Sequence, residues 1–562
     1  MVQVKAVAGL RSSSAQLSSA LWLGDSDHRI DLGPLGVVIG YVFARSTGLR
    51  VRDLPQDLAH QDITGLATWL VCECWGTYVA LFNDLDAIQV LPDPSGLLPV
   101  YVTTDEQDVV CTSDPGLIGQ SGCRQPEVSW EDLFHHLQHP SLRSARTCLY
   151  GLCELSPGYL VRLGDPRTAA RPIWVPASFM PDGRTFSFEA LSVQLREIAT
   201  HVLGAWSALS SRVVVAASGG VDSSLIAAAL ADAGRDFALM TVATSDPSGD
   251  ERAHVRVLAQ HLGVPLFEGQ YAPQNINLGL AVSARGPRPC GKAFMHETRR
   301  VGFEARRALG ADIVFDGNGG DNLFCYLHSA APVLDRWFCD GLSRGTWSTL
   351  VDMCRVTETT VPQMARAFRR RWARGTAFAL QPADSRLLSG QQGQSAIPET
   401  LRDWRDQVPR KHPGKVDHLA LLLATQNHLH GAGPSPAFAQ FSPLMSQPLL
   451  EFCLSVPTWI WCMGGINRAL ARAAFADVLP AAVTRRISKA GPDSLMHMVF
   501  AANHALIRDM LMDGLLMRNG ILDRHAVDLA LSPGKAGVET DDATLYRLLD
   551  LTEAEAWVRS WR

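Results

Sequence analysis

The chain has 562 residues, of which 47% are hydrophobic and 19% are charged, which excludes a disordered protein and allows two or three domains. Its formal net charge of −5 excludes a general nucleic-acid-binding protein, because such a protein carries a strongly basic face. No apolar run reaches the ~18 residues of a membrane span, and residues 1–10 lack a signal-peptide pattern, so we expect a cytoplasmic protein without a membrane span.

Residues 71–161 read as short apolar runs that are separated by turn residues. The runs at 77–82, 87–91 and 97–102 are interrupted by Asn83-Asp84 and by Asp93-Pro94-Ser95-Gly96. Alternation of this kind is typical of strands that are joined by turns. We predict a β-rich domain here, with a few helices, one of them near Trp130–Gln138.

The pattern changes after Pro181-Asp182-Gly183. Residues 188–209 have helical spacing, and apolar strands then alternate with helices. The predicted strands are 213–217, 237–242 and Ile313–Phe315, and the predicted helices are 223–233 and 251–262. This order predicts a doubly wound parallel sheet that binds its ligand at the carboxyl ends of the strands. From about Val333 onward the pattern is mainly helical.

The most informative segment is Ser218-Gly219-Gly220-Val221-Asp222-Ser223-Ser224, which follows the first of these strands and opens a helix. Backbone N–H groups and the positive end of a helix dipole can surround an anion there. The two glycines let the backbone approach a phosphate, and the three serine hydroxyls can add donors. The segment lacks the GxxxxGK[ST] pattern of a Walker A loop. We predict that it binds the pyrophosphate of ATP; the alternative is a glycine turn with an N-capping serine.

A second glycine-rich loop, Asp316-Gly317-Asn318-Gly319-Gly320-Asp321-Asn322, follows the strand Ile313–Phe315. Carboxylates therefore stand at the tips of two strands, Asp222 in the first loop and Asp321 in the second. A carboxylate beside an anion is unfavourable unless a cation lies between them, so we predict that Asp222 and Asp321 bind Mg²⁺. For Asp321 the alternative is capping of the following helix.

The two loops resemble those of the asparagine synthetase family, whose synthetase domain carries an SGGxDSS pyrophosphate loop and a later glycine-rich acidic loop. Other segments that resemble the family are 93–101, 113–114, 155–158, 467–472 and 486–489. The resemblance implies an α/β protein with two domains: a glutaminase-like α+β sandwich of the Ntn type over residues 1–185, and a synthetase domain over residues 186–562. The synthetase domain has a parallel sheet of the PP-loop ATP pyrophosphatase type and a large helical C-terminal part. ATP and Mg²⁺ are the implied cofactors, with adenine and ribose near Ala216, Val242 and Asp316-Gly317.

One departure from the family concerns the amine donor. Glutamine-hydrolysing members begin Met-Cys, whereas residue 2 here is Val2, so we expect no ammonia from glutamine. Two kinds of relative have an inactive first domain: β-lactam synthetases, which carry a tyrosine where this chain has Asn318, and lasso peptide cyclases. The acidic loop with its continuation to Pro332, and the segments 287–289 and 442–448, resemble the cyclases, which we favour.

A lasso peptide cyclase is an AMP-forming carbon–nitrogen ligase. This resemblance implies a precursor peptide substrate, whose Asp or Glu side chain is adenylated and then attacked by the peptide's N-terminal amine to form a macrolactam. The predicted catalytic residues are Asp222, Asp321 and Lys489, whose ammonium would stabilise the oxyanion. A leader peptidase and a leader-binding protein are the implied partners. The alternatives are a small-molecule amide ligase of the β-lactam or asparagine synthetase type, a non-catalytic scaffold, and a tRNA-modifying PP-loop enzyme.

Some charged residues have two open roles. Arg468 and Arg472 stand four apart, as on one helix face, and either support phosphates or pair with acids. Glu251 either orients a substrate or caps a helix. The five arginines from Arg366 to Arg374 form either a solvated helix face or a docking patch for an acidic peptide or a protease.

Overall fold

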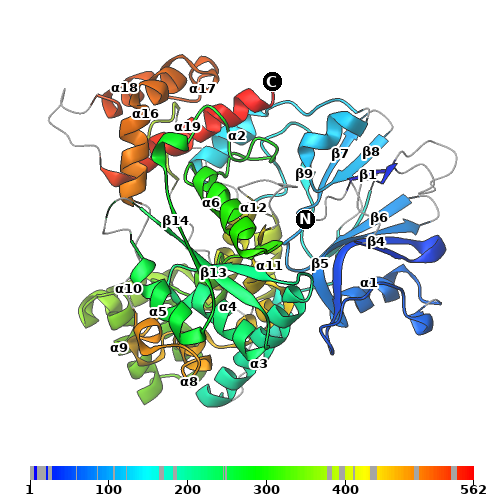
Figure 1. Ribbon diagram of the computed structural model, residues 1–562, viewed down its shortest axis with the longest axis vertical. Coiled ribbons are helices and arrows are strands. Elements are labelled where there is room, and N and C mark those ends of the chain that lie inside the picture. The colour runs from blue at the N-terminus through cyan, green and yellow to red at the C-terminus, as the bar shows by residue number, and fades with distance from the viewer. Residues whose placement is uncertain are drawn as a thin grey trace.

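The structure is a computed structural model. It describes residues 5–8, 21–22, 28–58, 60–84, 87–105, 108–121, 123–163, 170–180, 186–244, 246, 250–375, 383–390, 399–408, 412–430, 440–486, 493–532 and 541–562. The chain forms two antiparallel sheets, one parallel sheet and many helices (Figure 1). It is therefore a mixed α/β protein, as the sequence predicts.

The strands and helices follow one another as two groups, strand-rich and then helix-rich. The strands are β1 (Lys5–Ala8), β2 (Leu21–Trp22), β3 (Arg29–Asp31), β4 (Gly36–Ala44), β5 (Cys74–Asp84), β6 (Ala87–Pro92), β7 (Tyr101–Asp105), β8 (Asp108–Thr112), β9 (Cys153–Glu154), β10 (Tyr159–Arg162), β11 (Arg171–Pro172), β12 (Val213–Ala216), β13 (Phe237–Ala243), β14 (Leu266–Gln270), β15 (Ile313–Phe315) and β16 (Gln440–Phe441). The α-helices are α1 (Ile63–Cys72), α2 (Trp130–Gln138), α3 (Phe188–Ser207), α4 (Val221–Asp232), α5 (Arg252–Leu262), α6 (Met295–Leu309), α7 (Gly320–Leu323), α8 (Ala331–Asp340), α9 (Arg344–Val356), α10 (Val361–Arg374), α11 (Glu399–Gln407), α12 (Pro413–His430), α13 (Gln447–Ser455), α14 (Ala469–Ala474), α15 (Ala481–Thr484), α16 (Asp493–Asp513), α17 (Leu515–Arg518), α18 (Arg524–Ala530) and α19 (Asp542–Ser560).

The N-terminal part is a sandwich of two antiparallel sheets, with strand orders β2-β1-β8-β7-β9 and β11-β10-β6-β5-β4-β3. Val79 and Val90 of one sheet share a buried cluster with Val109 of the other, so the two sheets face each other. Side chains alternate along a strand, and Val110 therefore points outward, where it packs with Leu133 of α2. Helix α1 packs against β5. The layers thus follow the order α–β–β–α, while the glutaminase-like relationship stays a prediction.

The parallel sheet has the strand order β14-β13-β12-β15-β16, and every neighbouring pair is parallel. The strands predicted from the sequence are confirmed as β12, β13 and β15, with α4 and α5 near the predicted bounds. Val213 and Val215 pack with α3 and α4, whereas Val214 packs with Val301 of α6 on the opposite face. Helices on both faces explain why β12 is apolar at every position rather than at alternate ones. The sheet is therefore doubly wound.

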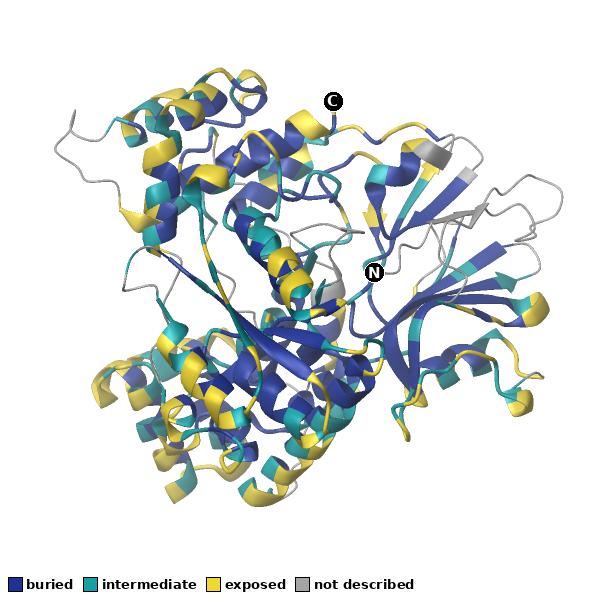
Figure 2. Cartoon of the chain, viewed as in Figure 1, coloured by how far each residue is buried: buried dark blue, intermediate teal, exposed yellow. Residues whose placement is uncertain are grey.

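The helical regions lie at two separate ends of the molecule. Helices α8, α9 and α10 pack on one another at one end, and α16 to α19 gather near α2 at the other (Figure 1). The central strands β12, β13 and β15 of the parallel sheet are mostly buried, whereas the edge strands and the outer faces of these helices are more exposed (Figure 2). No helix in the described ranges is both long and apolar enough to cross a lipid bilayer.

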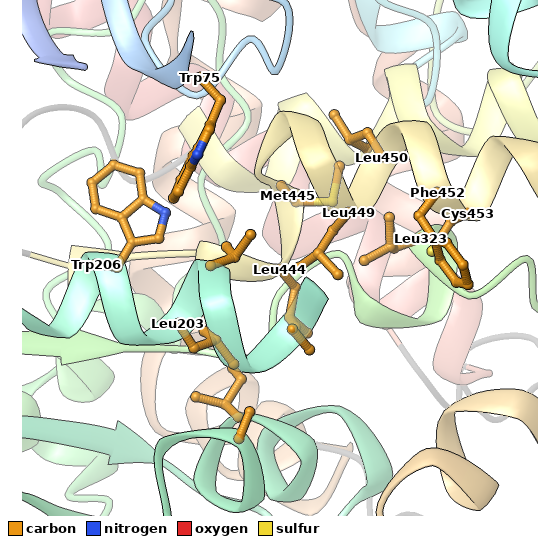
Figure 3. Close-up of a cluster of buried hydrophobic side chains, with 14 of the residues drawn as sticks. Trp75, Leu203, Trp206, Leu323, Leu444, Met445, Leu449, Leu450, Phe452 and Cys453 are labelled. Carbon is orange, nitrogen blue, oxygen red and sulfur yellow. The ribbon is translucent and has the colours of Figure 1, made fainter. Parts of the chain in front are cut away.

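One apolar core joins the sandwich to the parallel-sheet part. Figure 3 shows Trp75 of β5 and Trp206 of α3 beside the buried side chains of α13 and of the segment before it. Trp206 also donates a hydrogen bond from Nε1 to Ser446 Oγ at 2.8 Å. The sandwich and the parallel-sheet part therefore share one continuous apolar core.

The predicted strand at residues 97–102 is displaced in the structure. Strand β7 begins only at Tyr101, because the turn before it is longer than expected. The Asp93 carboxylate accepts hydrogen bonds from the backbone N–H groups of Ser95 (2.9 Å) and Gly96 (3.1 Å), and Gly96 has a φ of +66°. An aspartate that binds the N–H groups after it stabilises a turn over an extended strand.

Candidate active site

The two glycine-rich loops meet at the point where the order of the parallel strands reverses. The chain runs from β12 outward through β13 and β14, and it returns to the other side of β12 with β15 and β16. The phosphate loop (Ser218–Ser224) follows β12 and the acidic loop (Asp316–Asn322) follows β15, which pairs directly with β12. Open α/β sheets bind ligands at such a reversal, outside the carboxyl ends of the strands.

The phosphate loop has the backbone that close approach to an anion requires. Gly219 has a φ of +65°, and Gly220 is the N-cap of α4 without any capping side chain. Ser223 Oγ accepts a hydrogen bond from Ser218 N at 3.3 Å, which folds the loop over the first turn of the helix. Ser224 Oγ is buried and has no hydrogen-bond partner in the described part of the chain. A buried hydroxyl in this state favours a polar ligand.

The acidic loop is tied to the edge strand β16 through Asp316. The Asp316 carboxylate accepts hydrogen bonds from Asn318 N (2.9 Å), from Ser442 Oγ (2.7 Å) and from the Gln440 amide. Burial raises the pKa of Asp316, although these hydrogen bonds oppose the rise. In the following turn Gly319 has a φ of +84°. Asp316 therefore fixes the loop, and its predicted neighbourhood to adenine and ribose stays a prediction, as it does for Ala216 and Val242.

The structure brings Asp222 and Asp321 together on one arginine. Arg468 Nη1 lies 2.8 Å from Asp222 Oδ2 and 2.5 Å from Asp321 Oδ1. The side chain of Asp222 is 8% exposed, whereas that of Asp321 is 42% exposed. Asp321 lies in the first turn of α7, whose N-cap is Gly319, so its side chain does not cap that helix. Two strand tips thus direct their carboxylates at a single cationic atom.

Glycine at position 320 is what allows the two loops to touch. A Cβ atom at this position would lie 2.4 Å from Asp222 Cγ, and a Cβ at Gly317 would lie 3.0 Å from Ser223 N. A Cβ atom essentially never lies within 3.0 Å of another heavy atom that is not bonded to it, so the acidic loop can pack this closely on the phosphate loop only with glycine at 320.

Arg468 does not lie on the helix that the sequence predicts for it. It is the N-cap of α14 and has a left-handed backbone with a φ of 54°, a strained conformation for a residue with a side chain. The prediction that Arg468 and Arg472 share one helix face is therefore wrong. Arg468 turns toward the aspartates and lies 5.4 Å from the Tyr326 ring centroid, whereas Arg472 donates to the carbonyls of Asn467 and Thr484. Burial, with the nearby charge of Arg468, lowers the pKa of Arg472 to about 10.

A third arginine supports the phosphate loop from behind. Arg486 donates from Nη1 to Ser218 O at 2.9 Å and from Nη2 to Glu251 Oε1 at 2.6 Å. Glu251 stands at the N-cap of α5 but makes no side-chain cap, so helix capping is not its role. The chain after Arg486 contains Lys489, which lies outside the described residues. Its proposed contact with an oxyanion stays a prediction.

Several of these residues could not be assigned from the sequence. Arg468 stands 246 positions after Asp222, and only the fold brings the two side chains together. Gln440 is the first residue of the two-residue strand β16 and Ser442 follows it, and a strand of two residues is too short to give a periodic signal. The glycines at 317 and 320 are visible in the sequence, but nothing in it indicates that they pack against the phosphate loop.

The donor set at this position suits a small hard cation. Asp222 and Asp321 offer carboxylate oxygens, the ligand type that Mg²⁺ prefers, and the Arg468 guanidinium already stands between them as a positive charge. No group of three or more His, Cys, Asp or Glu side chains that could hold a metal occurs within the described ranges. Two carboxylates without a third protein ligand are typical of a Mg²⁺ that is shared with substrate phosphates.

A parallel sheet with two glycine-rich loops at its reversal point is an α/β architecture that binds ligands at that point. The family model for asparagine synthase matches residues 207–430 and 441–559, more than half of the chain. The chain belongs to the asparagine synthase family.

Comparison with other proteins adds little beyond the family. No curated protein matches the chain significantly. Among solved structures, the allosteric regulatory enzyme of purine biosynthesis is similar, with 13% identity and a TM-score of 0.18. The match covers 42% of this chain and 60% of that chain. A TM-score this low carries no argument about fold or function.

Proposed function

We propose that the chain is an ATP-dependent lasso peptide cyclase, which closes a macrolactam ring on a precursor peptide. The observation that carries the proposal is the meeting of Asp222 and Asp321 on Arg468, beside the phosphate loop. This geometry suits activation of a carboxylate by a nucleotide. The likeness of the acidic loop and of segments 287–289 and 442–448 to the cyclases supports a peptide as the substrate.

The proposed reaction has two steps that balance. An oxygen of the Asp or Glu side chain of the peptide attacks the α-phosphorus of ATP, and the bond to pyrophosphate breaks. The N-terminal amine of the same peptide then attacks the acyl carbon of the adenylate, loses a proton, and displaces AMP. The products are the cyclic peptide, AMP and pyrophosphate, with one water fewer in the peptide.

Most of the rate would come from binding and orientation. The phosphate loop offers the backbone N–H groups at the start of α4, and the dipole of that helix favours pyrophosphate there. Asp222 and Asp321 would hold Mg²⁺, which supplies positive charge to the leaving pyrophosphate. Effective molarities of well-oriented groups can account for about 7–11 kcal/mol of the barrier.

A positive charge is also needed where amide formation places charge on the acyl oxygen. We assign this role to Lys489, as the family resemblance implies. Arg468 supplies a second cation at the site, since it is buried and already directed at the reacting region by its left-handed backbone. Residues 1–185 would form a glutaminase-like domain without the thiol nucleophile. A leader peptidase and a leader-binding protein would supply the free peptide.

One observation favours a second candidate, a small-molecule ligase of the β-lactam synthetase type. Tyr326, four residues past the acidic loop, lies with its ring 5.4 Å from the Arg468 guanidinium. In such a ligase Tyr326 would supply the tyrosine of the catalytic base. Asn318 occupies the position in the acidic loop where β-lactam synthetases carry their tyrosine. A small amino acid substrate would then replace the peptide.

The experiment incubates the full chain with ATP, Mg²⁺ and a linear peptide of free N-terminus with one internal Asp or Glu, and it reads peptide mass and AMP. We expect one AMP for each peptide that loses one water. The Asp222→Asn variant should form neither product, whereas Asp57→Asn, at an exposed position in residues 56–58, should match the wild type. AMP release with small amino acids but never with peptides would select the second candidate. Absence of any ATP turnover with either class would refute both.

A further inference from the structure

A cavity lies away from the glycine-rich loops, where the sandwich meets helices α3 and α4 of the parallel-sheet part. It has a volume of about 450 Å³, within the range of small-molecule sites. Its walls come from β4 and the segment after it, from the C-terminal half of α3, and from the end of α4. The apolar side includes Tyr41, Phe43 and Leu209.

The lining of this cavity is basic. It includes Arg50, Arg52 and Arg235 together with His28 and His201, and no carboxylate belongs to it. Like charges that share a cavity repel one another, although solvent weakens this repulsion at the exposed rim. An anion between them would remove the repulsion.

Nearby acids do not balance these charges, because other arginines already hold them. Asp232 pairs with Arg196 at 2.5 Å, and Asp236 pairs with Arg212 at 2.8 Å, on either side of Arg235 in the sequence. Within the ranges that the structure describes, Arg52 and Arg235 form no ion pair. The two guanidiniums thus keep their donors for a ligand.

Two polar atoms beside the arginines also lack partners. Thr200 Oγ1 and His201 Nε2 are buried, and neither has a hydrogen bond to any described residue. His201 lies against Gly48, where an added Cβ would be 3.0 Å from His201 Cε1. Buried polar atoms without partners are unfavourable, and a polar ligand in the cavity would supply their hydrogen bonds.

The cavity is separate from the candidate active site. Arg235 precedes β13, so it lies at the amino end of the parallel strands, whereas both glycine-rich loops follow the carboxyl ends. A ligand here therefore does not compete with ATP for the phosphate loop. The inference also does not depend on which amide the enzyme forms.

We propose that this cavity binds a small phosphate monoester with a ring-bearing body. A phosphate monoester carries about −1.5 to −2 charges at pH 7 and can form ion pairs with two arginines, whereas a carboxylate carries only one charge. Arg52 and Arg235 bind the phosphate, and Thr200 and His201 contribute the neighbouring polar contacts. Tyr41 and Phe43 face the ring.

The test uses phenyl phosphate as the probe and isothermal titration calorimetry as the readout. Four proteins are compared: the wild type, Arg52→Gln/Arg235→Gln, Asp222→Asn, and Arg29→Gln as a control arginine on β3 outside the cavity. We expect equal affinity in the wild type, Asp222→Asn and Arg29→Gln, and at least about tenfold weaker binding in the double variant. Benzoate and inorganic phosphate should each bind more weakly than phenyl phosphate.

Three outcomes would overturn the proposal. Unchanged binding in the double variant would place the probe elsewhere, and loss of binding in Asp222→Asn would place it on the phosphate loop. Equal affinity for benzoate would remove the commitment to phosphate. Because Arg52 and Arg235 are exposed, the double variant should unfold at the wild-type temperature without ligand, which separates loss of binding from loss of fold.

Discussion

Arginine and carboxylate side chains meet in two buried clusters of this molecule, and the clusters have opposite proportions. At the seam between the sandwich and the helical part, Glu154 is held by two arginines, Arg143 and Arg288, each 2.6 Å away. At the candidate active site, one arginine is held by two aspartates. The first cluster has an excess of positive charge and the second an excess of negative charge.

The seam cluster, formed by Glu154, Arg143 and Arg288, is buried, and its charged groups pair with one another. Glu154, Arg143 and Arg288 are all less than 10% exposed, and the remaining donors of Arg288 reach the carbonyls of Ser144 and Arg146. Burial alone would raise the pKa of Glu154, but the charges of Arg143 and Arg288 outweigh it and lower the pKa to about 2. Such a cluster holds two parts of a chain together and leaves no place for a ligand.

The cluster on Arg468 is short of positive charge and open on one side. Asp321 is 42% exposed, and the phosphate loop stands beside it. The difference teaches that buried charge alone does not mark a site. What marks it is an unbalanced carboxylate pair with access to solvent at the end of a parallel sheet.

The largest expected effect would come from the Asp222→Asn substitution. The substitution keeps the shape of the side chain but removes one of the two negative charges of the aspartate pair. We therefore expect the rate of AMP formation to fall by roughly 10³-fold, which corresponds to about 4 kcal/mol in the activation barrier. Rates of ATP-dependent AMP release measure the effect. The unfolding temperature of the same variant should change little, because Arg468 still forms its ion pair with Asp321. A variant with wild-type turnover would remove this cluster from the reaction.

The next effect concerns stability at the seam. Glu154→Gln leaves two buried arginines without their counter-charge, and breaking a buried pair in this way costs about 3 kcal/mol or more. Urea unfolding should show the loss, with Glu131→Gln on the exposed face of α2 as the control. The folded variant should still bind ATP normally. If ATP affinity fell together with stability, the two clusters would not be independent.

Low pH should destabilise the protein through the same Glu154 cluster. Because the pKa of Glu154 lies below its ordinary value of 4.5, its stabilising contribution is complete above that pH and is lost as the pH falls from 4.5 toward 2. The loss amounts to about 3 kcal/mol at most, since one pKa unit corresponds to about 1.4 kcal/mol. Unfolding curves between pH 6 and 3 should show a fall in the wild type that is smaller in Glu154→Gln. Parallel curves for the two proteins would contradict the assignment.

A smaller effect is expected for Arg468→Gln in the presence of Mg²⁺. Without the guanidinium, the aspartates no longer have a competing cation, so Mg²⁺ should bind about fivefold more tightly, which corresponds to about 1 kcal/mol. Calorimetric Mg²⁺ titration without nucleotide measures this change. Arg29→Gln serves as the control for lost positive charge. Weaker Mg²⁺ binding in Arg468→Gln would show that the arginine supports the metal instead of replacing it.

The smallest effect belongs to the arginines of α10. Arg371 is buried and pairs with Asp417 at 3.0 Å, so it is not part of any surface patch, whereas Arg369 and Arg370 are exposed. Arg369→Gln/Arg370→Gln should change the free energy of unfolding by less than about 0.5 kcal/mol, and Arg371→Gln should change it far more. Chemical unfolding of both variants compares their free energies of unfolding, and it thereby separates the solvated Arg369 and Arg370 from the structural Arg371.

The sequence alone predicts those elements whose signal is local. Residues 130–138 and 313–315 carry complete helix and strand patterns, and the structure places α2 and β15 there without a shift. Strand β16 could not be predicted, because its two residues pair with β15 more than a hundred positions away. The same holds for the candidate site: both loops are visible as motifs, but the arginine that joins them depends on a strained backbone at Arg468 that no periodicity reveals.

The missing side chain at position 320 has a further consequence for how a nucleotide could reach the site. Since Gly320 packs directly on Asp222, the two loops touch at this point and leave no room between them for a side chain at position 320. Of the two carboxylates, that of Asp321 is the more exposed, at 42% against 8% for Asp222. A nucleotide would therefore meet Asp321 before Asp222, and a larger substituent at position 320 would push the two loops apart and disturb the cation site.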